Sequence, residues 1–214
     1  ALAMDKGFER LQTHFQAVGR PTTALAACEL RSPAPRSRDD FNAFNVEYLK
    51  SLKALGCESE SKNPVARSNM APLLSKPTTS LLYAFSYTEP LDSHESSPNS
   101  PDFVISGKPE NKLQADGSSL VVGGEGIHEE DWIDKARYTL DVMIERVGAL
   151  GASWEAVSAV QIYSPRDIGV LWSTFEEYGL AHAGLHWFPG WPPVKGLLFE
   201  IDVRRTSRET VIDA

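Results

Sequence analysis

The sequence predicts an α+β protein built from two copies of one structural unit in tandem, the first copy lacking its N-terminal hairpin. Helical and extended patterns follow one another along the chain in the same order twice. The apolar register of the first helix recurs 132 residues later, and a glycine and a Ser-Pro pair recur at the same shift. Chance agreement between two amphipathic helices does not explain the shared glycine and Ser-Pro positions. The repeat therefore indicates duplication of one unit.

The first copy contains two predicted helices and three predicted extended segments. Apolar residues at spacings of three and four mark the helices, and Gly, Pro and Ser-Pro positions separate them from the strands. In order, the expected elements are a helix over 8–18, a strand over 24–30, a helix from Asp39 or Asp40 to Gly56, an extended piece over 65–70 and a strand over 80–88.

The second copy has the same order of elements and an additional pair of strands in front of its first helix. That helix carries Leu140, Met143, Val147 and Leu150 along one face. In order, the expected elements are strands over 103–106 and 119–122 that form a hairpin, a helix over 131–150, a strand over 156–163, a helix over 167–178 and a strand over 196–203.

These elements divide the chain into two units. We expect an incomplete N-terminal unit over 4–89, a Pro- and Ser-rich linker over 90–101, a complete C-terminal unit over 102–206 and a polar tail over 207–214. Residues 1–3 precede a methionine and are treated as a cloning remnant. The truncated first copy leaves strand edges that need cover. We therefore expect a homo-oligomer, a trimer of chains.

Composition excludes several classes of protein. The 214 residues include 21 Lys and Arg against 29 Asp and Glu, a net charge of −8, which argues against nucleic acid as a partner. No apolar run is long enough to span a membrane, and the N-terminus lacks a signal-peptide pattern. Cys28 and Cys57 form neither a disulfide framework nor a metal site. We expect a cytoplasmic protein without a metal or cofactor.

Several motifs, taken in their order along the chain, carry a resemblance to a known family. They are Asp40–Tyr48 and Asn63–Asn69 in the first copy, and Ser119–Gly124, Trp154–Pro165 and Leu198–Val203 in the second. In this order they resemble the RidA/YjgF/YER057c family. The resemblance implies trimers of chorismate-mutase-like α+β units with ligand clefts between neighbours. It also implies hydrolysis of enamines or imines derived from amino acids, with a small carboxylate as the substrate.

The resemblance assigns roles to individual residues. Arg67, in the sequence Pro64-Val-Ala-Arg-Ser, matches the arginine that holds the substrate carboxylate. Its planar fork of donors suits a carboxylate. Asn45 matches an asparagine that faces the cleft, and Glu200 matches a catalytic glutamate that orients water or donates a proton. Burial in an apolar strand would raise the pKa of that glutamate and equip it for proton transfer.

Further substrate contacts are expected from four other residues. Gly123 and Gly124 match the small residues whose backbone can approach a ligand closely. Asn69 occupies a position where many members have cysteine. Phe103, with Trp172 and Trp187, provides aromatic surroundings that suit a conjugated diacid.

Neither copy contains a whole site by itself. Ala84 stands at the glutamate position of the first copy, Trp172 replaces the asparagine of the second copy, and residues 185–187 replace its arginine segment. We therefore expect one complete site, shared between Arg67 and Asn45 of one unit and Glu200 and Gly124 of the other, and one degenerate site.

Each of these residues also has an ordinary structural alternative. Arg67 can be a structural arginine beside Pro64, Asn45 a solvated helix residue, and Glu200 an outward-facing residue of an alternating strand. The His182 and His186 pair has a metal-ligand spacing, but no third ligand pattern accompanies it.

The function expected from the resemblance is a metal-independent hydrolytic deaminase of an enamine or imine carboxylate. An aromatic-degradation intermediate such as 2-aminomuconate is an attractive substrate, because members resembling this family include 2-aminomuconate deaminases. One alternative is a chorismatase-like enzyme acting on chorismate, since that family also carries two such halves in one chain. The other is a non-catalytic small-molecule-binding or scaffold protein of the same fold.

Overall fold

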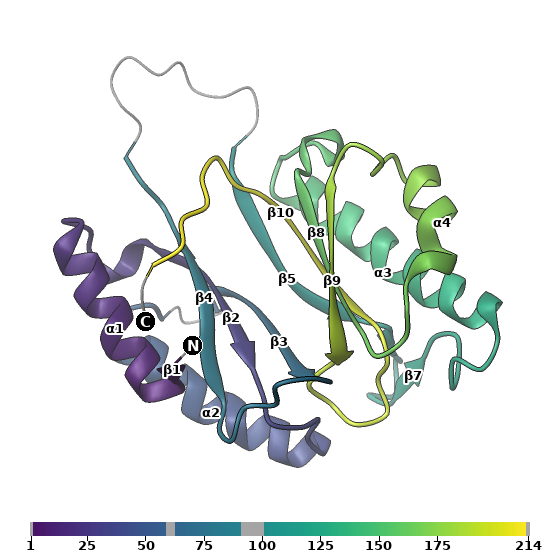
Figure 1. The fold of residues 1–214 in the computed structure, drawn as a ribbon, viewed down its shortest axis with the longest axis horizontal. Helices are drawn as coiled ribbons and strands as arrows, with labels where there is room; N and C mark the ends of the chain where they lie inside the picture. Colours follow the sequence, from purple (N-terminus) through teal and green to yellow (C-terminus); the bar gives the residue numbers. More distant parts are fainter. Residues whose placement is uncertain (1, 59–62, 91–100, 213–214) are drawn as a thin grey trace.

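Eight strands form one mixed sheet in the computed structural model, which describes residues 2–58, 63–90 and 101–212 (Figure 1). In chain order they are β1 (Leu2–Ala3), β2 (Leu25–Arg31), β3 (Ala66–Pro72), β4 (Leu81–Tyr87), β5 (Phe103–Pro109), β8 (Ala159–Ser164), β9 (Gly184–Trp191) and β10 (Glu200–Arg205). Their order across the sheet is β1-β4-β2-β3-β9-β8-β10-β5, so each half of the chain supplies four neighbouring strands. The predicted α+β class is confirmed.

The N-terminal half packs two helices, α1 (Met4–Ala17) and α2 (Arg38–Ala54), against its strands. Within it, β2 pairs in parallel with β3 and antiparallel with β4. The core of this half buries Leu11 and Phe15 from α1 and Tyr48 from α2. Both predicted helices are confirmed, but Ser37 rather than Asp39 or Asp40 caps α2, because its Oγ accepts the N–H of Asp40.

The C-terminal half repeats this arrangement with α3 (Glu129–Ala149) and the short helix α4 (Trp172–Glu177). Here β8 pairs in parallel with β9 and antiparallel with β10. Leu140 and Met143 of α3 and Phe175 of α4 are buried in its core. Figure 1 shows α1 and α2 flanking the strands at one end of the molecule and α3 and α4 at the other.

The halves join through their corresponding strands. β3 and β9, each the parallel partner of its half's central strand, pair antiparallel where Ala71 faces Trp191 and Pro72 faces Gly190. The short 3-10 helices η1 (Thr22–Ala24) and η2 (Trp154–Ala156) precede β2 and β8 at the same shift of 132 residues.

Buried charged side chains lie where the two halves meet. Arg204 donates to Glu29 at 2.7 Å and to Asp202 at 2.8 Å. The Asp202 carboxylate also accepts hydrogen bonds from Ser68 of β3 and Tyr163 of β8. Because buried charges are tolerated only when paired and hydrogen-bonded, this network requires both halves to be in place.

The predicted hairpin between residues 103–106 and 119–122 is wrong. β5 extends to Pro109 and pairs with β10. The second predicted strand becomes β7 (Ser119–Val121), which pairs with β6 (Asn111–Leu113) in a separate two-stranded sheet. A turn at Gly117, with φ of 83°, reverses the chain close enough to bring these two short strands together.

Two strands in the second half also differ from prediction. The sequence pattern missed β9, because Gly184, Pro189 and Gly190 within it are residues typical of turns. The predicted strand over 156–163 begins only at Ala159, after η2. The last strand, expected over 196–203, begins at Glu200 and ends at Arg205.

The predicted helix over 167–178 is shorter and divided. It consists of the 3-10 helix η3 (Gly169–Leu171) followed by α4. The predicted linker over 90–101 falls almost wholly on residues 91–100, which lie outside the described residues. No helix in the described part of the chain is long and apolar enough to cross a membrane. Cys28 and Cys57 are free thiols and both are buried.

Candidate active site

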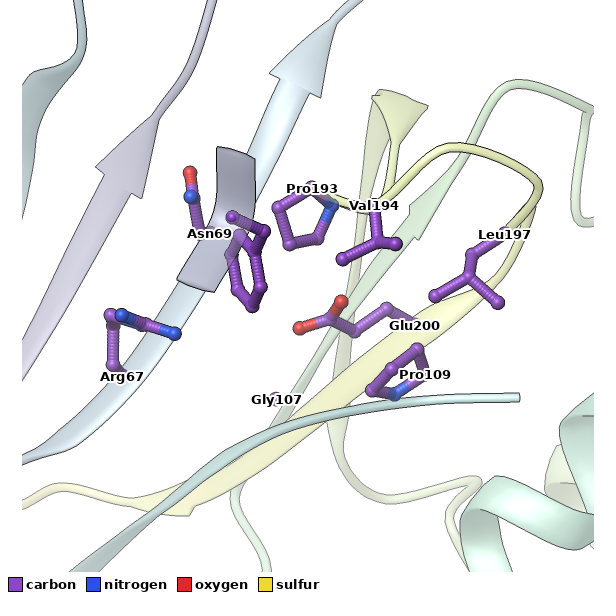
Figure 2. Close-up of a pocket in the computed structure, with 9 residues that line it drawn as sticks. Arg67, Asn69, Gly107, Pro109, Pro193, Val194, Leu197 and Glu200 are labelled. Carbon is purple, nitrogen blue, oxygen red and sulfur yellow. The ribbon is translucent and has the colours of Figure 1, made fainter. Parts of the chain in front are cut away.

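A cavity of about 150 Å³ opens between β3, β5 and β10, where the two halves of the chain meet. Figure 2 shows its walls: Arg67 lies on one side, on β3, and Glu200 on the other, on β10. The residues that line it are Phe41, Arg67, Asn69, Gly107, Pro109, Pro193, Val194, Leu197 and Glu200. Three of the predicted site residues, Arg67, Asn69 and Glu200, therefore share one cavity.

The guanidinium of Arg67 is held from behind by α2. Its Nη1 donates to Oδ1 of Asn45 at 2.7 Å, and its Cζ lies 5.3 Å from the ring centre of Phe41 and 4.9 Å from that of Tyr48. The backbone N–H of Arg67 donates to the hydroxyl of Ser106 on β5. Asn45 thus contacts Arg67 and does not line the cavity itself.

No ion pair joins Arg67 to an acidic side chain within the described residues. Burial lowers the pKa of Arg67, whereas the Tyr48 hydroxyl and the Glu200 carboxyl raise it. A guanidinium keeps its proton under any physiological condition. The cavity therefore presents a fixed positive charge with N–H donors available to an anion.

Glu200 is a buried carboxyl group without a full set of partners. Its side chain is 4% exposed, and Oε2 has no hydrogen-bond partner among the described residues. Burial raises the pKa of Glu200 to about 8, and the nearby Asp202 carboxylate adds to this shift, while Arg67 counteracts it. A carboxyl group with such a pKa holds its proton at neutral pH and can release it during a reaction.

Asn69 is fixed by a chain of hydrogen bonds. Its Oδ1 accepts from the hydroxyl of Ser32 at 3.1 Å, and Nη1 of Arg36 donates to that hydroxyl at 2.7 Å. The side chain is 2% exposed, and its Nδ2 has no partner in the described part of the chain. Asn69 therefore lines the cavity with an amide whose donor is unused.

Three predicted contacts lie elsewhere in the structure. Gly123 and Gly124 form a turn after β7 with φ of 65° and 48°, and they do not line the cavity. The carbonyl of Gly124 instead accepts a hydrogen bond from Lys135 of α3. Phe103 is 8% exposed at the start of β5 and packs in the apolar core of the C-terminal half.

The counterpart of this cavity in the other half lacks the same chemistry. Strand pairing places Leu185 opposite Val160, as Arg67 lies opposite Cys28 at a shift of 132 residues. Glu200 pairs with Tyr163, and the equivalent of Tyr163, Arg31, pairs with Leu81. By strand pairing, the counterpart of Glu200 is thus Leu81 rather than Ala84, and neither residue is acidic.

Sequence reasoning missed Phe41, Gly107 and the segment 193–197. Phe41 stacks on Phe44 at 6.4 Å on α2, a spacing that the sequence shows only as part of an amphipathic helix. Gly107 lies directly against Oε1 of Glu200, where any Cβ would collide with that oxygen. A glycine within an otherwise regular strand was the available signal.

The described residues contain no cluster of three His, Cys, Asp or Glu side chains that could hold a metal ion. His182 of the predicted histidine pair contacts the carbonyl of Val157. The aromatic residues Trp172 and Trp187 both lie outside the cavity lining, and Trp187 donates its indole N–H to the carbonyl of Ser164.

Comparisons with known proteins identify the family. A family model described as 2-aminomuconate deaminase CnbZ matches residues 1–210. The chain is 36% identical over 209 residues to a 2-amino-5-chloromuconate deaminase of Comamonas testosteroni, covering 97% of this chain and 82% of that protein.

Two solved structures show more distant likeness. A chorismatase aligns over 94% of this chain and 70% of its own, with a TM-score of 0.52 and 13% identity, a likeness of fold alone. A Rid-family protein of Yersinia pestis aligns over 51% of this chain and 81% of its own, with a TM-score of 0.38 and 18% identity. On the family model and the identity to the Comamonas testosteroni enzyme, the chain belongs to the 2-aminomuconate deaminase CnbZ family.

Proposed function

We propose that the cavity between Arg67 and Glu200 is the site at which this chain hydrolyses a 2-aminomuconate-type enamine dicarboxylate, without a metal, to a 2-oxo acid and ammonia. One observation carries the proposal: a guanidinium without an acidic partner faces a buried carboxyl group whose Oε2 is unpartnered, across one cavity. The relative from Comamonas testosteroni, named for a chlorinated aminomuconate, supports this substrate class.

The size of the cavity fits a six-carbon substrate. A buried cavity of about 150 Å³ in another protein accommodates benzene, which has the same number of carbon atoms as muconate. The volume found here is about 150 Å³. Apolar lining from Phe41, Val194 and Leu197 suits the conjugated carbon chain, while Arg67 and Asn69 supply donors for its oxygens.

Arg67 binds the carboxylate next to the carbon that bears nitrogen. Its remaining N–H groups can donate two parallel hydrogen bonds to that carboxylate, which fixes the plane of the substrate as well as its position. Asn45 holds Nη1 in place, so little side-chain entropy is lost when the substrate binds.

Glu200 performs the proton transfers. In its protonated form it gives a proton to the enamine carbon, and the C–N bond becomes a C=N iminium. The resulting carboxylate removes a proton from water as the water oxygen bonds to the iminium carbon. The carbinolamine then releases ammonia and becomes the 2-oxo acid, so one water is consumed for each ammonia released, and Glu200 ends protonated.

Neither alternative function has comparable support. A chorismatase-like reaction rests on a likeness of fold at 13% identity, against 36% identity to a deaminase. A non-catalytic role would be favoured if Arg67 and Glu200 lay on unconnected surfaces, whereas both line one cavity.

The test is a direct assay of the purified chain. Ammonia release from 2-aminomuconate is expected, followed at the ultraviolet absorbance of the conjugated substrate, with no release of pyruvate from chorismate. The Glu200→Gln variant, which keeps the shape of the side chain, should lose deamination. Pyruvate release by the wild-type chain, or full deamination by Glu200→Gln, would overturn the assignment.

We also propose that the chain arose by duplication of one unit, with an N-terminal unit over 4–89 and a C-terminal unit over 102–206. The shared order of elements, the 132-residue shift between η1 and η2 and the matching strand pairings support it. Ser32 and Ser164, at the same shift, contact Asn69 and Trp187, which occupy equivalent positions on β3 and β9.

The oligomer we propose is a trimer of chains. The outer face of α2 supports association, because Val46 and Leu49 are 53% and 47% exposed there. Light scattering coupled to size-exclusion chromatography should give three times the chain mass of 23.6 kDa. A monomer mass would contradict this proposal without affecting the cavity, which forms within one chain.

A further inference from the structure

A fully buried ion pair lies directly behind the strand that carries Glu200. Glu110, which follows β5, and Lys135 of α3 are both 0% exposed, and Nζ of Lys135 lies 3.5 Å from Oε1 of Glu110. Removing two charges from water is costly, so such a pair persists only where further hydrogen bonds satisfy both groups.

The carboxylate of Glu110 uses those hydrogen bonds to hold the backbone next to Glu200. Oε1 accepts the N–H of Leu198 at 2.6 Å, and Oε2 accepts the N–H of Phe199 at 3.1 Å. The backbone N–H of Glu110 in turn donates to the carbonyl of Phe199 at 3.1 Å. Three hydrogen bonds from one residue thus fix the two residues immediately before Glu200.

Lys135 fixes Glu110 from the other side. Its Nζ donates to the carbonyls of Val122 and Gly124, each at 2.8 Å. Gly123, with φ of 65°, lies so close to the carbonyl of Asp131 that a Cβ would collide with it. The glycine turn therefore lets the chain approach α3 closely enough to surround the Lys135 ammonium with carbonyl oxygens.

We propose that Glu110 is a positioning residue for the deaminase reaction, which fixes the position of Glu200 through the backbone N–H groups of Leu198 and Phe199. This inference rests on the proposed role of Glu200. A glutamine at this position has one acceptor oxygen instead of two, and its NH2 group cannot accept the second N–H. The geometry therefore requires a carboxylate rather than an amide.

The charge of Glu110 acts on Glu200 as well as its hydrogen bonds. The charged groups that influence Glu200 are Asp202 on its own strand, Arg67 on β3, Lys108 on β5, Glu110 after β5 and Arg146 on α3. Among them, Glu110 and Asp202 raise the pKa of Glu200, and Arg67 and Lys108 lower it. Removing the negative charge at 110 should lower the pKa of Glu200.

The test compares pH profiles of kcat/KM for wild type, Glu110→Gln and Glu110→Asp. In Glu110→Gln the high-pH limb should move to lower pH, on the order of one pH unit, the size of shift that one nearby charge produces. Its kcat should fall about tenfold, the loss expected when a charge-assisted hydrogen bond is broken. Glu110→Asp keeps the charge, so its limb should stay near the wild-type position.

Leu140→Ala is the matched control. Leu140 is fully buried on the same helix as Lys135 and belongs to the apolar core. Its truncation should lower Tm without moving the pH limb, which separates positioning from a general loss of stability. An unmoved limb and unchanged kcat in Glu110→Gln would overturn the inference.

A spectroscopic titration keeps the inference testable if Glu110→Gln has little activity. The carboxyl stretch of Glu200, identified by its loss in Glu200→Gln, should titrate at lower pH in Glu110→Gln than in wild type. An identical midpoint in both proteins would overturn the inference. Failure of the proposed function shows separately, as full activity of Glu200→Gln.

Discussion

Oε1 of Glu200 occupies the space above Gly107 in which the Cβ of any other residue would stand. β5 and β10 pair antiparallel, with Ile201 opposite Lys108 and an irregularity between Ile201 and Val203. The extra residue on β5 brings Gly107 against the Glu200 side chain. The missing side chain thus makes room for the buried carboxyl group.

Gly107→Ala should therefore reduce activity more than stability. The added methyl displaces the Glu200 carboxyl group, and a misplaced proton donor lowers kcat by about tenfold to a hundredfold. Steady-state kinetics and circular dichroism measure the two effects. Gly148→Ala is the control, because a Cβ there meets no atom within 4 Å. Equal kcat in both variants would contradict the prediction.

Arg67→Ala should raise KM for the dicarboxylate by about a hundredfold, because it removes a charge-assisted bidentate contact worth a few kcal/mol. Arg67→Lys keeps the charge without the planar fork and should give an intermediate KM. Arg137→Ala, which breaks an exposed ion pair with Glu177, serves as the matched control. Unchanged ammonia release by Arg67→Ala would remove the basis for the substrate orientation.

Asn45→Ala should raise KM about tenfold, less than Arg67→Ala. The variant leaves the charge in place and removes the acceptor that holds Nη1 at 2.7 Å, a hydrogen bond to a charged group. Asn42→Ala on the same helix, where the side chain is exposed, should have no effect. The double variant with Arg67→Ala should be no worse than Arg67→Ala alone, since Asn45 acts through Arg67.

Local patterns predicted much of the fold. Apolar spacings located α1, α2 and α3, and the 132-residue shift paired η1 with η2. The pairing of β5 with β10 escaped prediction, because a hairpin is the simplest partner for neighbouring strands while the real partner is far along the chain. β9 escaped because its strand carries glycine and proline.

The candidate site divides in the same way. Arg67, Asn45 and Glu200 were assigned by family motifs, and the structure places the first two in contact and the third across the cavity. Phe41 and Gly107 were not, because their roles depend on contacts between segments distant in sequence. The glycine motif was located correctly, but its carbonyl contacts Lys135.

The last prediction concerns stability, because a buried carboxyl group with a raised pKa destabilises the fold as pH rises. Burial raises the pKa of Glu200 from 4.5 to about 8. Between these values the unfolded chain has released this proton while the folded chain still holds it, so rising pH favours unfolding. Below 4.5 both states hold the proton and the effect vanishes; above about 8 it is complete.

Glu200→Gln removes this titration. The free energy of unfolding of the variant, relative to wild type, should therefore increase by about 1.4 kcal/mol per pH unit across that window, roughly 3–5 kcal/mol in all. Urea denaturation at pH 4.5, 6 and 8 measures the difference, and any pH-independent cost of the amide cancels in the comparison. Glu177→Gln, at an exposed carboxylate, is the control. A difference between variant and wild type that stays constant from pH 4.5 to 8 would show that Glu200 ionises normally, and the proton transfer assigned to it would lose its physical basis.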